Sequence, residues 1–297
     1  NKYGPFPADL IVVYKSLVGD DNDNIKGCVG FGAAAWLGLI KDYGEEGLYE
    51  MKRMLEQNAL EELAQNAETD KVLRKVYNQR EVDELVLVDI VANQGDDDPD
   101  FESIEEFGQD CFVPLTVGGG ITRIEQVQRL LRAGADKVAV NTAAYSRPEL
   151  VSEIARRYGA QCVVASIDVR TQDRSWACFS HAGQQVTGRE VVAWARELED
   201  RGAGEILITS IERDGTMQGY DLPLIEAVVS AVKIPVIASG GAGNYQHMID
   251  AVKQAGASAV AAASIFHFTE QTPAEAKVAM AYAGIPIRHP FQAGLTE

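Results

Sequence analysis

The sequence predicts an α/β fold built on a parallel β-sheet. From Val82 onward, short runs rich in β-branched residues alternate with longer stretches that have helical spacing of apolar residues. The short runs are apolar almost throughout, as strands must be when helices cover both faces of their sheet. The second half of this region also repeats the first half, which favours two stacked half-barrels.

Seven strands are expected, each closing before a helix-like stretch. In order, they are ELVLVDI, VPLTVGG, DKVAVNT, CVVASIDV, EILITSI, IPVIASGG and SAVAAASIF. The stretches RIEQVQRLLRAGA, RPELVSEIARRYGA and GREVVAWARELEDRGA are among the helices expected between them.

The repeat has a fixed offset of 121 positions, which relates Glu84 to Glu205 and Gly119 to Gly240. Two halves of four strands would give a (β/α)8 barrel of the TIM type. The eighth strand, which has no match, is the first strand of the barrel. The repeat relates it to CVVASIDV, so the equivalent of Asp168 falls at position 47, where the sequence reads EEGLYEM and is not an apolar strand. We therefore predict a barrel that lacks a recognisable first strand.

A small helical segment is predicted before the barrel. Between Gly38 and Glu81, the apolar positions Met51, Met54 and Leu55 follow helical spacing, and no proline interrupts them. The predicted domains are residues 1–81, which are helical, and residues 82–297, which form the barrel.

Composition narrows the classes of partner and compartment. A net charge of −17 repels a phosphate backbone, so nucleic acid is not an expected partner of the whole chain. No apolar run reaches the roughly 18 residues of a membrane span and no leader-like segment opens the chain, which predicts a cytoplasmic protein. The cysteines are scattered, which favours reduced thiols over a disulfide framework or a zinc site.

Two glycine-rich turns are candidates for phosphate binding. Residues 118–120 and 240–243 each end an apolar strand and open a helix, where glycine lets backbone N–H groups approach an anion. Glycines that merely make tight turns are the alternative. The duplication, together with Asn141, Thr142 and Ser264 at neighbouring strand ends, favours a substrate with two phosphates.

Asp168 is the candidate catalytic residue. It ends the strand run CVVASIDV, and the active groups of parallel barrels stand at the carboxyl ends of strands. A carboxylate at a partly desolvated barrel mouth suits general acid–base catalysis. A helix N-cap or a loop carboxylate is the alternative explanation.

Residues 82–288 resemble the cyclase subunit of imidazole glycerol phosphate synthase. The resemblance rests on DELVLVDI, PLTVGGGI, RLLRAGADKVAVNTAA, GAQCVVASIDV, GAGEILITSIERDGTMQGYD, IPVIASGGAG and AAASIFHF. It implies that Asp168 is one of two catalytic aspartates. It also implies that the substrate and its phosphates are bound by Asn141, Thr142, Thr209, Asp214, Gly215, Gly240, Gly241 and Ser264. The first glycine turn adds Gly119 and Gly120 to this predicted binding set.

The same resemblance implies a reaction and a partner. Ammonia from a glutaminase (amidotransferase) subunit would pass through the barrel and add to the phosphoribulosyl-formimino derivative of aminoimidazole carboxamide ribotide. The products would be imidazole glycerol phosphate and aminoimidazole carboxamide ribotide, and no cofactor is expected. Glu84, Lys137 and Glu205 match three of the four charged residues of the family's ammonia gate, although such ion pairs are common at barrel bottoms.

The sequence departs from this family at the start of the barrel. The first strand, with the other catalytic aspartate and the fourth gate residue, has no match, so we expect impaired activity. The segments SHAGQQVTG and HFTEQTPAEAK resemble paralogues that act with an amidotransferase to amidinate surface sugars, which leaves that activity as an alternative.

A second resemblance covers residues 5–80. The segment PADLIVVYKSLVGDDNDNIKGCVGFG is similar to the helix-hairpin-helix region of phage-type 5′–3′ exonucleases and flap endonucleases. It implies that Asp20 and Asp23 are metal ligands, if this segment is functional. A nuclease fragment that binds DNA is therefore the alternative function. The family's N-terminal half, which supplies the other metal carboxylates, has no match here, so we expect no cleavage.

Overall fold

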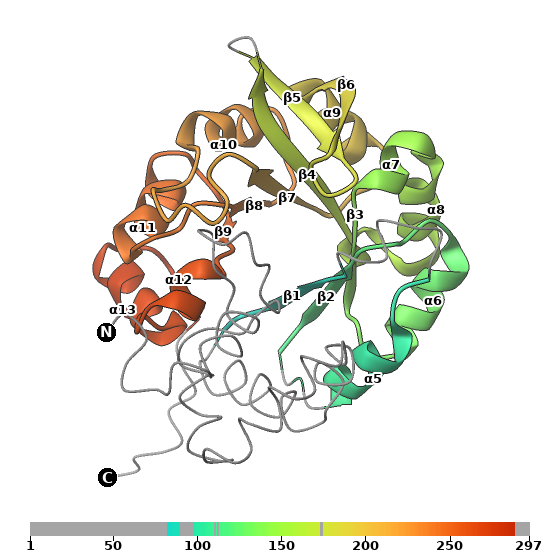
Figure 1. Cartoon of the computed structure of the whole chain (residues 1–297), viewed down its shortest axis with the longest axis horizontal. Helices are drawn as coiled ribbons and strands as arrows, with labels where there is room; N and C mark the ends of the chain where they lie inside the picture. Colours follow the sequence, from blue (N-terminus) through green and yellow to red (C-terminus); the bar gives the residue numbers. More distant parts are fainter. Residues whose placement is uncertain (1–81, 90–97, 110, 112, 173–174, 289–297) are drawn as a thin grey trace, which may run out of the picture. The chain divides into compact units, whose positions relative to one another are not determined.

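The computed structural model describes residues 82–89, 98–109, 111, 113–172 and 175–288 (Figure 1). The predicted helical segment, the nuclease resemblance and the metal-ligand candidates Asp20 and Asp23 lie outside the described residues. The predicted domain boundary near residue 81 stays a prediction. Within the described part, no helix has the length and apolarity needed to cross a membrane.

The seven expected strands form one parallel sheet. Their order is β1 (Leu85–Val88), β2 (Leu115–Gly118), β3 (Lys137–Val140), β4 (Val163–Gln172), β7 (Glu205–Ser210), β8 (Val236–Ser239) and β9 (Ala259–Val260). Each pairs in parallel with its neighbours in this order. The last strand is shorter than expected, because the alanine-rich run SAVAAASIF has low β-propensity and continues into α12 (Ser264–Phe268).

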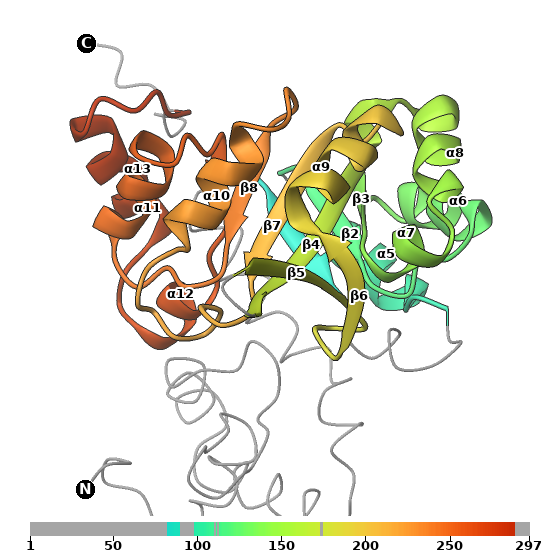
Figure 2. The ribbon, with the colours of Figure 1, turned by 90° about the horizontal axis from the view of Figure 1, so that it is seen from above.

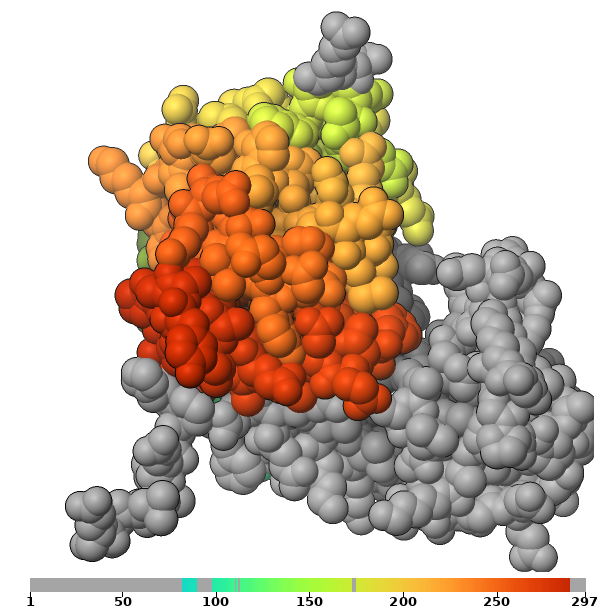
Figure 3. Space-filling view, turned by 90° about the vertical axis from the view of Figure 1, so that its left-hand side faces the viewer, coloured from blue at the N-terminus to red at the C-terminus, as the bar shows by residue number. Residues whose placement is uncertain are grey.

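Helices lie outside the strands, as Figure 1 shows. Besides a short 3₁₀ turn at Ala160–Cys162, they are α5 (Phe101–Gln109), α6 (Ile124–Arg132), α7 (Thr142–Ser146), α8 (Glu149–Tyr158), α9 (Val191–Asp200), α10 (Leu222–Val229), α11 (Tyr245–Lys253) and α13 (Pro273–Tyr282). Each buries at least one apolar residue; α6, for example, buries Val127 and Leu130 completely. Side chains of the second half make a continuous surface in orange to red in Figure 3.

The 121-residue repeat is present in the structure. Helix α11 begins and ends 121 positions after α6, and β8 begins and ends 121 positions after β2. The parallel α/β barrel architecture of the TIM type is therefore confirmed. Among the described residues, β4 and α9 have no counterpart in the first half.

The described sheet is an arc with two edges. Among the described residues, β1 pairs only with β2, and β9 pairs only with β8. The register places Val86 and Val88 on the same face as the core residues Ala139 and Val164. Val86 and Val88 are nevertheless 38% and 48% exposed, whereas a filled barrel interior would bury them. The described strands alone therefore leave one side of the barrel interior uncovered.

An antiparallel hairpin that we did not predict extends from the sheet. Strand β4 runs past Asp168 and pairs with β5 (Ser175–Ser180), which pairs with β6 (Gln185–Glu190). Figure 2 shows this ribbon at one end of the parallel strands. Its turn places His181, Ala182 and Gly183 at positive φ, a local geometry that hydrophobic patterning alone does not reveal.

Candidate active site at the carboxyl ends of the strands

All the candidate catalytic and phosphate-binding residues lie at or beyond the carboxyl ends of the parallel strands. Gly119 and Gly120 follow β2, and Asn141 and Thr142 follow β3. Asp168 and Thr209 lie on β4 and β7, and the others occupy the connections after β7, β8 and β9: Asp214, Gly215, Gly240, Gly241 and Ser264. Because the strands are parallel, these positions share one end of the sheet.

Asp168 is half-buried at this end, in a position that raises its pKa. Its register partners are Thr209 on β7 and Phe179 on β5. Burial, and to a smaller degree the negative charge of Asp214, raise the pKa of the Asp168 carboxyl from 3.8 to about 6. A carboxyl with such a pKa can both hold and release a proton near neutral pH, as general acid–base catalysis requires.

Both glycine turns are conformations that only glycine adopts without strain. Gly119 has a φ of +102°, and a Cβ atom there would lie 2.0 Å from the carbonyl oxygen of Asp89. Gly240 has a φ of +85°, and its Cβ would lie 2.8 Å from the carbonyl oxygen of Ser210. Asp89 and Ser210 are themselves 121 positions apart, so the repeat extends to the contacts within the two turns.

The end of β3 presents an unsatisfied polar atom. The Asn141 Oδ1 atom is buried and has no hydrogen-bond partner among the residues that the structure describes. The neighbouring Thr142 Oγ1 accepts a hydrogen bond of 3.0 Å from the backbone N–H of His181, in the β5–β6 turn. Sequence reasoning missed this contact. A buried oxygen that accepts no bond is suited to a ligand's hydroxyl or N–H group.

The loops after β7 and β8 are joined to each other. The Gly219 N–H donates to the carbonyl oxygen of Gly241 at 2.7 Å. The Asp214 N–H donates to the carbonyl of Ser210 at 2.9 Å, so Asp214 stands in a tight turn directly after β7. Gly215 follows with a φ of +77°, and no atom of the described residues beyond its chain neighbours lies within 4 Å of the position that a Cβ would take.

The three gate candidates meet at the opposite end of the strands. Lys137 Nζ donates to Glu84 Oε2 at 2.8 Å and to both carboxylate oxygens of Glu205 at 2.8 and 2.9 Å. Thr116 Oγ1 donates to the other oxygen of Glu84. Although burial opposes it, hydrogen bonding and charge attraction from both glutamates raise the pKa of Lys137, which keeps the ammonium charged.

Comparison with known proteins decides the family. A model of the family described as histidine biosynthesis protein matches residues 55–272. The chain belongs to this family. It is 52% identical over 216 residues to the imidazole glycerol phosphate synthase subunit HisF of Hyphomonas neptunium (strain ATCC 15444), a match that covers 73% of this chain and 86% of that protein.

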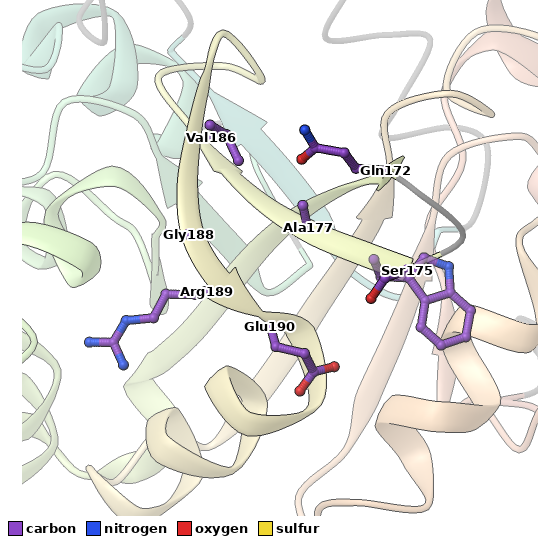
Figure 4. Close-up of a pocket in the computed structure, with 8 residues that line it drawn as sticks. Gln172, Ser175, Ala177, Val186, Gly188, Arg189 and Glu190 are labelled. Atoms are coloured by element: carbon purple, nitrogen blue, oxygen red, sulfur yellow. The ribbon is translucent and has the colours of Figure 1, made fainter.

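A shallow pocket of about 270 Å³ lies on the β4–β5–β6 ribbon, and its lining includes none of the candidate site residues (Figure 4). Its lining residues are Gln172, Ser175, Trp176, Ala177, Val186, Gly188, Arg189 and Glu190. The two charged members are engaged elsewhere: Arg189 pairs with Glu197, and Glu190 caps α9. We assign this pocket no role.

The described residues contain no cluster of three or more His, Cys, Asp or Glu side chains arranged to hold a metal ion. The three described cysteines, Cys111, Cys162 and Cys178, are free. The candidate site residues themselves supply carboxyl groups, a side-chain amide, hydroxyls and backbone N–H groups.

Proposed function

We propose that this chain carries the cyclase-type activity of imidazole glycerol phosphate synthase. The reaction adds ammonia to the phosphoribulosyl-formimino bisphosphate and gives imidazole glycerol phosphate and aminoimidazole carboxamide ribotide. One observation carries the proposal: half-buried Asp168 lies at the same end of the sheet as two glycine turns that the 121-residue repeat makes equivalent. The 52% identity to HisF supports it.

The two turns bind the two phosphates of the substrate. Each stands before a nine-residue helix, α6 or α11, whose N-terminal N–H groups and dipole favour an anion. Asn141 Oδ1 accepts a hydrogen bond from the part of the substrate between the phosphates. Thr142, Thr209 and Ser264 line the same cleft.

Asp168 transfers protons during cyclisation and cleavage. Its raised pKa, about 6, keeps the proton donor and acceptor forms close in free energy. The family uses a second aspartate on the first strand, for which this sequence has no match. The chain therefore works slowly unless another segment supplies that group, since loss of one acid–base group costs about 10² to 10⁴ in rate.

Ammonia enters from the opposite end, where Lys137 bridges Glu84 and Glu205. A glutaminase subunit binds at this end and delivers ammonia there. The bridge acts as a gate because Lys137 must release at least one glutamate before a molecule can pass.

The test uses the full chain, an ammonium salt and the bisphosphate substrate, with imidazole glycerol phosphate measured as the product. We expect slow formation that Asp168→Asn abolishes. Product formation that is unchanged in Asp168→Asn would refute the assigned role of this residue.

A further inference from the structure

Two side chains that sequence analysis did not single out hold the glycine turns in the same way. Gln126 is the third residue of α6, and His247 is the third residue of α11. Each accepts a hydrogen bond from a backbone N–H at the end of its turn or just after it. Gly243 N–H donates to His247 Nδ1 at 3.2 Å, and Thr122 N–H, two residues after Gly120, donates to Gln126 Oε1 at 2.8 Å. Both the acceptors and the donors are 121 positions apart.

Each side chain also reaches the loop that follows the preceding strand. Gln126 Nε2 donates to Asp98 Oδ1 at 2.7 Å. The His247 ring lies so close to Gly219 that a Cβ atom there would be 3.5 Å from the ring Cδ2. Asp98 and Gly219 are again 121 positions apart, so each side chain connects two equivalent βα loops in its own half.

The surroundings make these contacts restrictive. Gln126 is 2% exposed and also accepts from the Arg123 N–H at 3.0 Å. In the second half, a Cβ on Gly243 would lie 1.9 Å from the carbonyl oxygen of Met217. The turn is thus held from two sides, by the imidazole of His247 and by the loop after β7.

We propose that Gln126 and His247 are positioning residues that fix the two phosphate-binding turns. Neither needs to touch the substrate. A phosphate site made of backbone N–H groups depends on the direction of those groups, and a side chain that holds the turn sets that direction. The inference rests on the phosphate sites of the proposed function.

The two halves reach the same result with different chemistry. A backbone N–H can only donate, so His247 Nδ1 is the acceptor in its contact with Gly243. The other ring nitrogen, Nε2, lies 3.2 Å from Asn244 Nδ2. A glutamine supplies an acceptor oxygen, as Gln126 does in the first half. His247→Gln therefore transfers the first half's arrangement to the second half, whereas His247→Leu removes the acceptor and keeps the bulk.

The experiment titrates inorganic phosphate into the full chain by calorimetry, with folding checked by circular dichroism. We expect His247→Leu to weaken phosphate binding about tenfold, the effect of losing one hydrogen bond, and His247→Gln to stay within about threefold of wild type. Gln246→Leu is the matched control, because Gln246 is the exposed neighbour and bonds only Asp250 among the described residues. It should bind phosphate as wild type does.

If His247 only capped helix α11, replacing it would lower the stability of the fold and would not produce these differences in phosphate affinity. Phosphate affinity equal to wild type in a folded His247→Leu, or a loss in His247→Gln as large as in His247→Leu, would overturn the proposal. Amide hydrogen exchange at Gly243 tests the contact without any ligand. If wild type binds no phosphate, that result refutes the proposed phosphate sites and is distinct from a failure of the positioning role. If His247→Leu does not fold, rapid exchange of the wild-type Gly243 amide would still overturn the inference.

Discussion

Lys137 and Glu205 form an ion pair in which the Lys137 Nζ atom lies 2.8 and 2.9 Å from the two carboxylate oxygens of Glu205. The two residues lie on β3 and β7, which are separated in the sheet by β4. Such a contact requires the sheet to curve so that side chains from β3 and β7 meet. Glu84, before β1, joins the same cluster. The charged bottom of the barrel is therefore assembled even though the described strands form an open arc.

Replacing Lys137 by Met should destabilise the fold. Two carboxylates that are only 21–25% exposed would lose their shared cation, and removing one partner of a buried ion pair costs about 3–5 kcal/mol, less at this partial exposure. We expect a loss of about 1–3 kcal/mol in urea unfolding at pH 7.5. Lys233→Met, at an exposed lysine, is the control and should change the unfolding free energy little; an equal effect in both variants would contradict the account.

Replacing Asp168 by Asn should stabilise the fold at neutral pH while removing activity. Between pH 3.8 and about 6, the folded state keeps a proton on Asp168 that the unfolded state has released, so the stability of wild type falls as pH rises through this window. The full cost, up to about 3 kcal/mol, is present above pH 6. Urea unfolding should show the gain at pH 7.5 and little of it at pH 4; a gain independent of pH would contradict the raised pKa.

Replacing Gly241 by Asp should remove phosphate binding at the second turn. The change adds a negative charge beside the anion site and a Cβ atom 2.3 Å from the Gly219 carbonyl oxygen, at a φ of +109°. Gly188→Asp is the matched control, because Gly188 also has a positive φ but has no other atom within 4 Å of its Cβ position. Calorimetric titration with phosphate should separate the two variants, and identical responses would reject the assignment.

Binding to duplex or flap DNA should be negligible at physiological salt. The chain carries a net charge of −17, and phosphate contacts by cationic side chains supply most non-specific affinity for DNA. A gel-retardation series at increasing salt measures this directly. Tight, salt-sensitive binding with magnesium-dependent cleavage would instead favour the nuclease resemblance of residues 5–80.

Hydrophobic patterning was sufficient to predict the parallel strands and their repeat, because strands buried on both faces leave continuous apolar runs. The same logic placed Asp168 and the glycine turns at one end of the sheet. It could not predict the β5–β6 hairpin, whose β6 residues are mostly exposed and whose turn depends on positive φ at His181 and Ala182.

The contacts of Gln126 and His247 were also beyond sequence reasoning. A glutamine or histidine in the first turn of a helix has several available partners, and only the folded loops determine which N–H it accepts from. The repeat aligned these two positions, but their different side chains gave no signal of a shared role.

The most direct test of the central claim compares ammonia-dependent turnover of the bisphosphate substrate by three proteins. They are the full chain, a version whose residues 1–81 are replaced by a cyclase first strand and helix, and that version with Asp168→Asn. We predict slow turnover by the first, rescue in the second, and loss of at least about 10² in rate in the third. A folded second protein that forms no imidazole glycerol phosphate, or one whose rate survives Asp168→Asn, would contradict the assignment of this barrel as a cyclase.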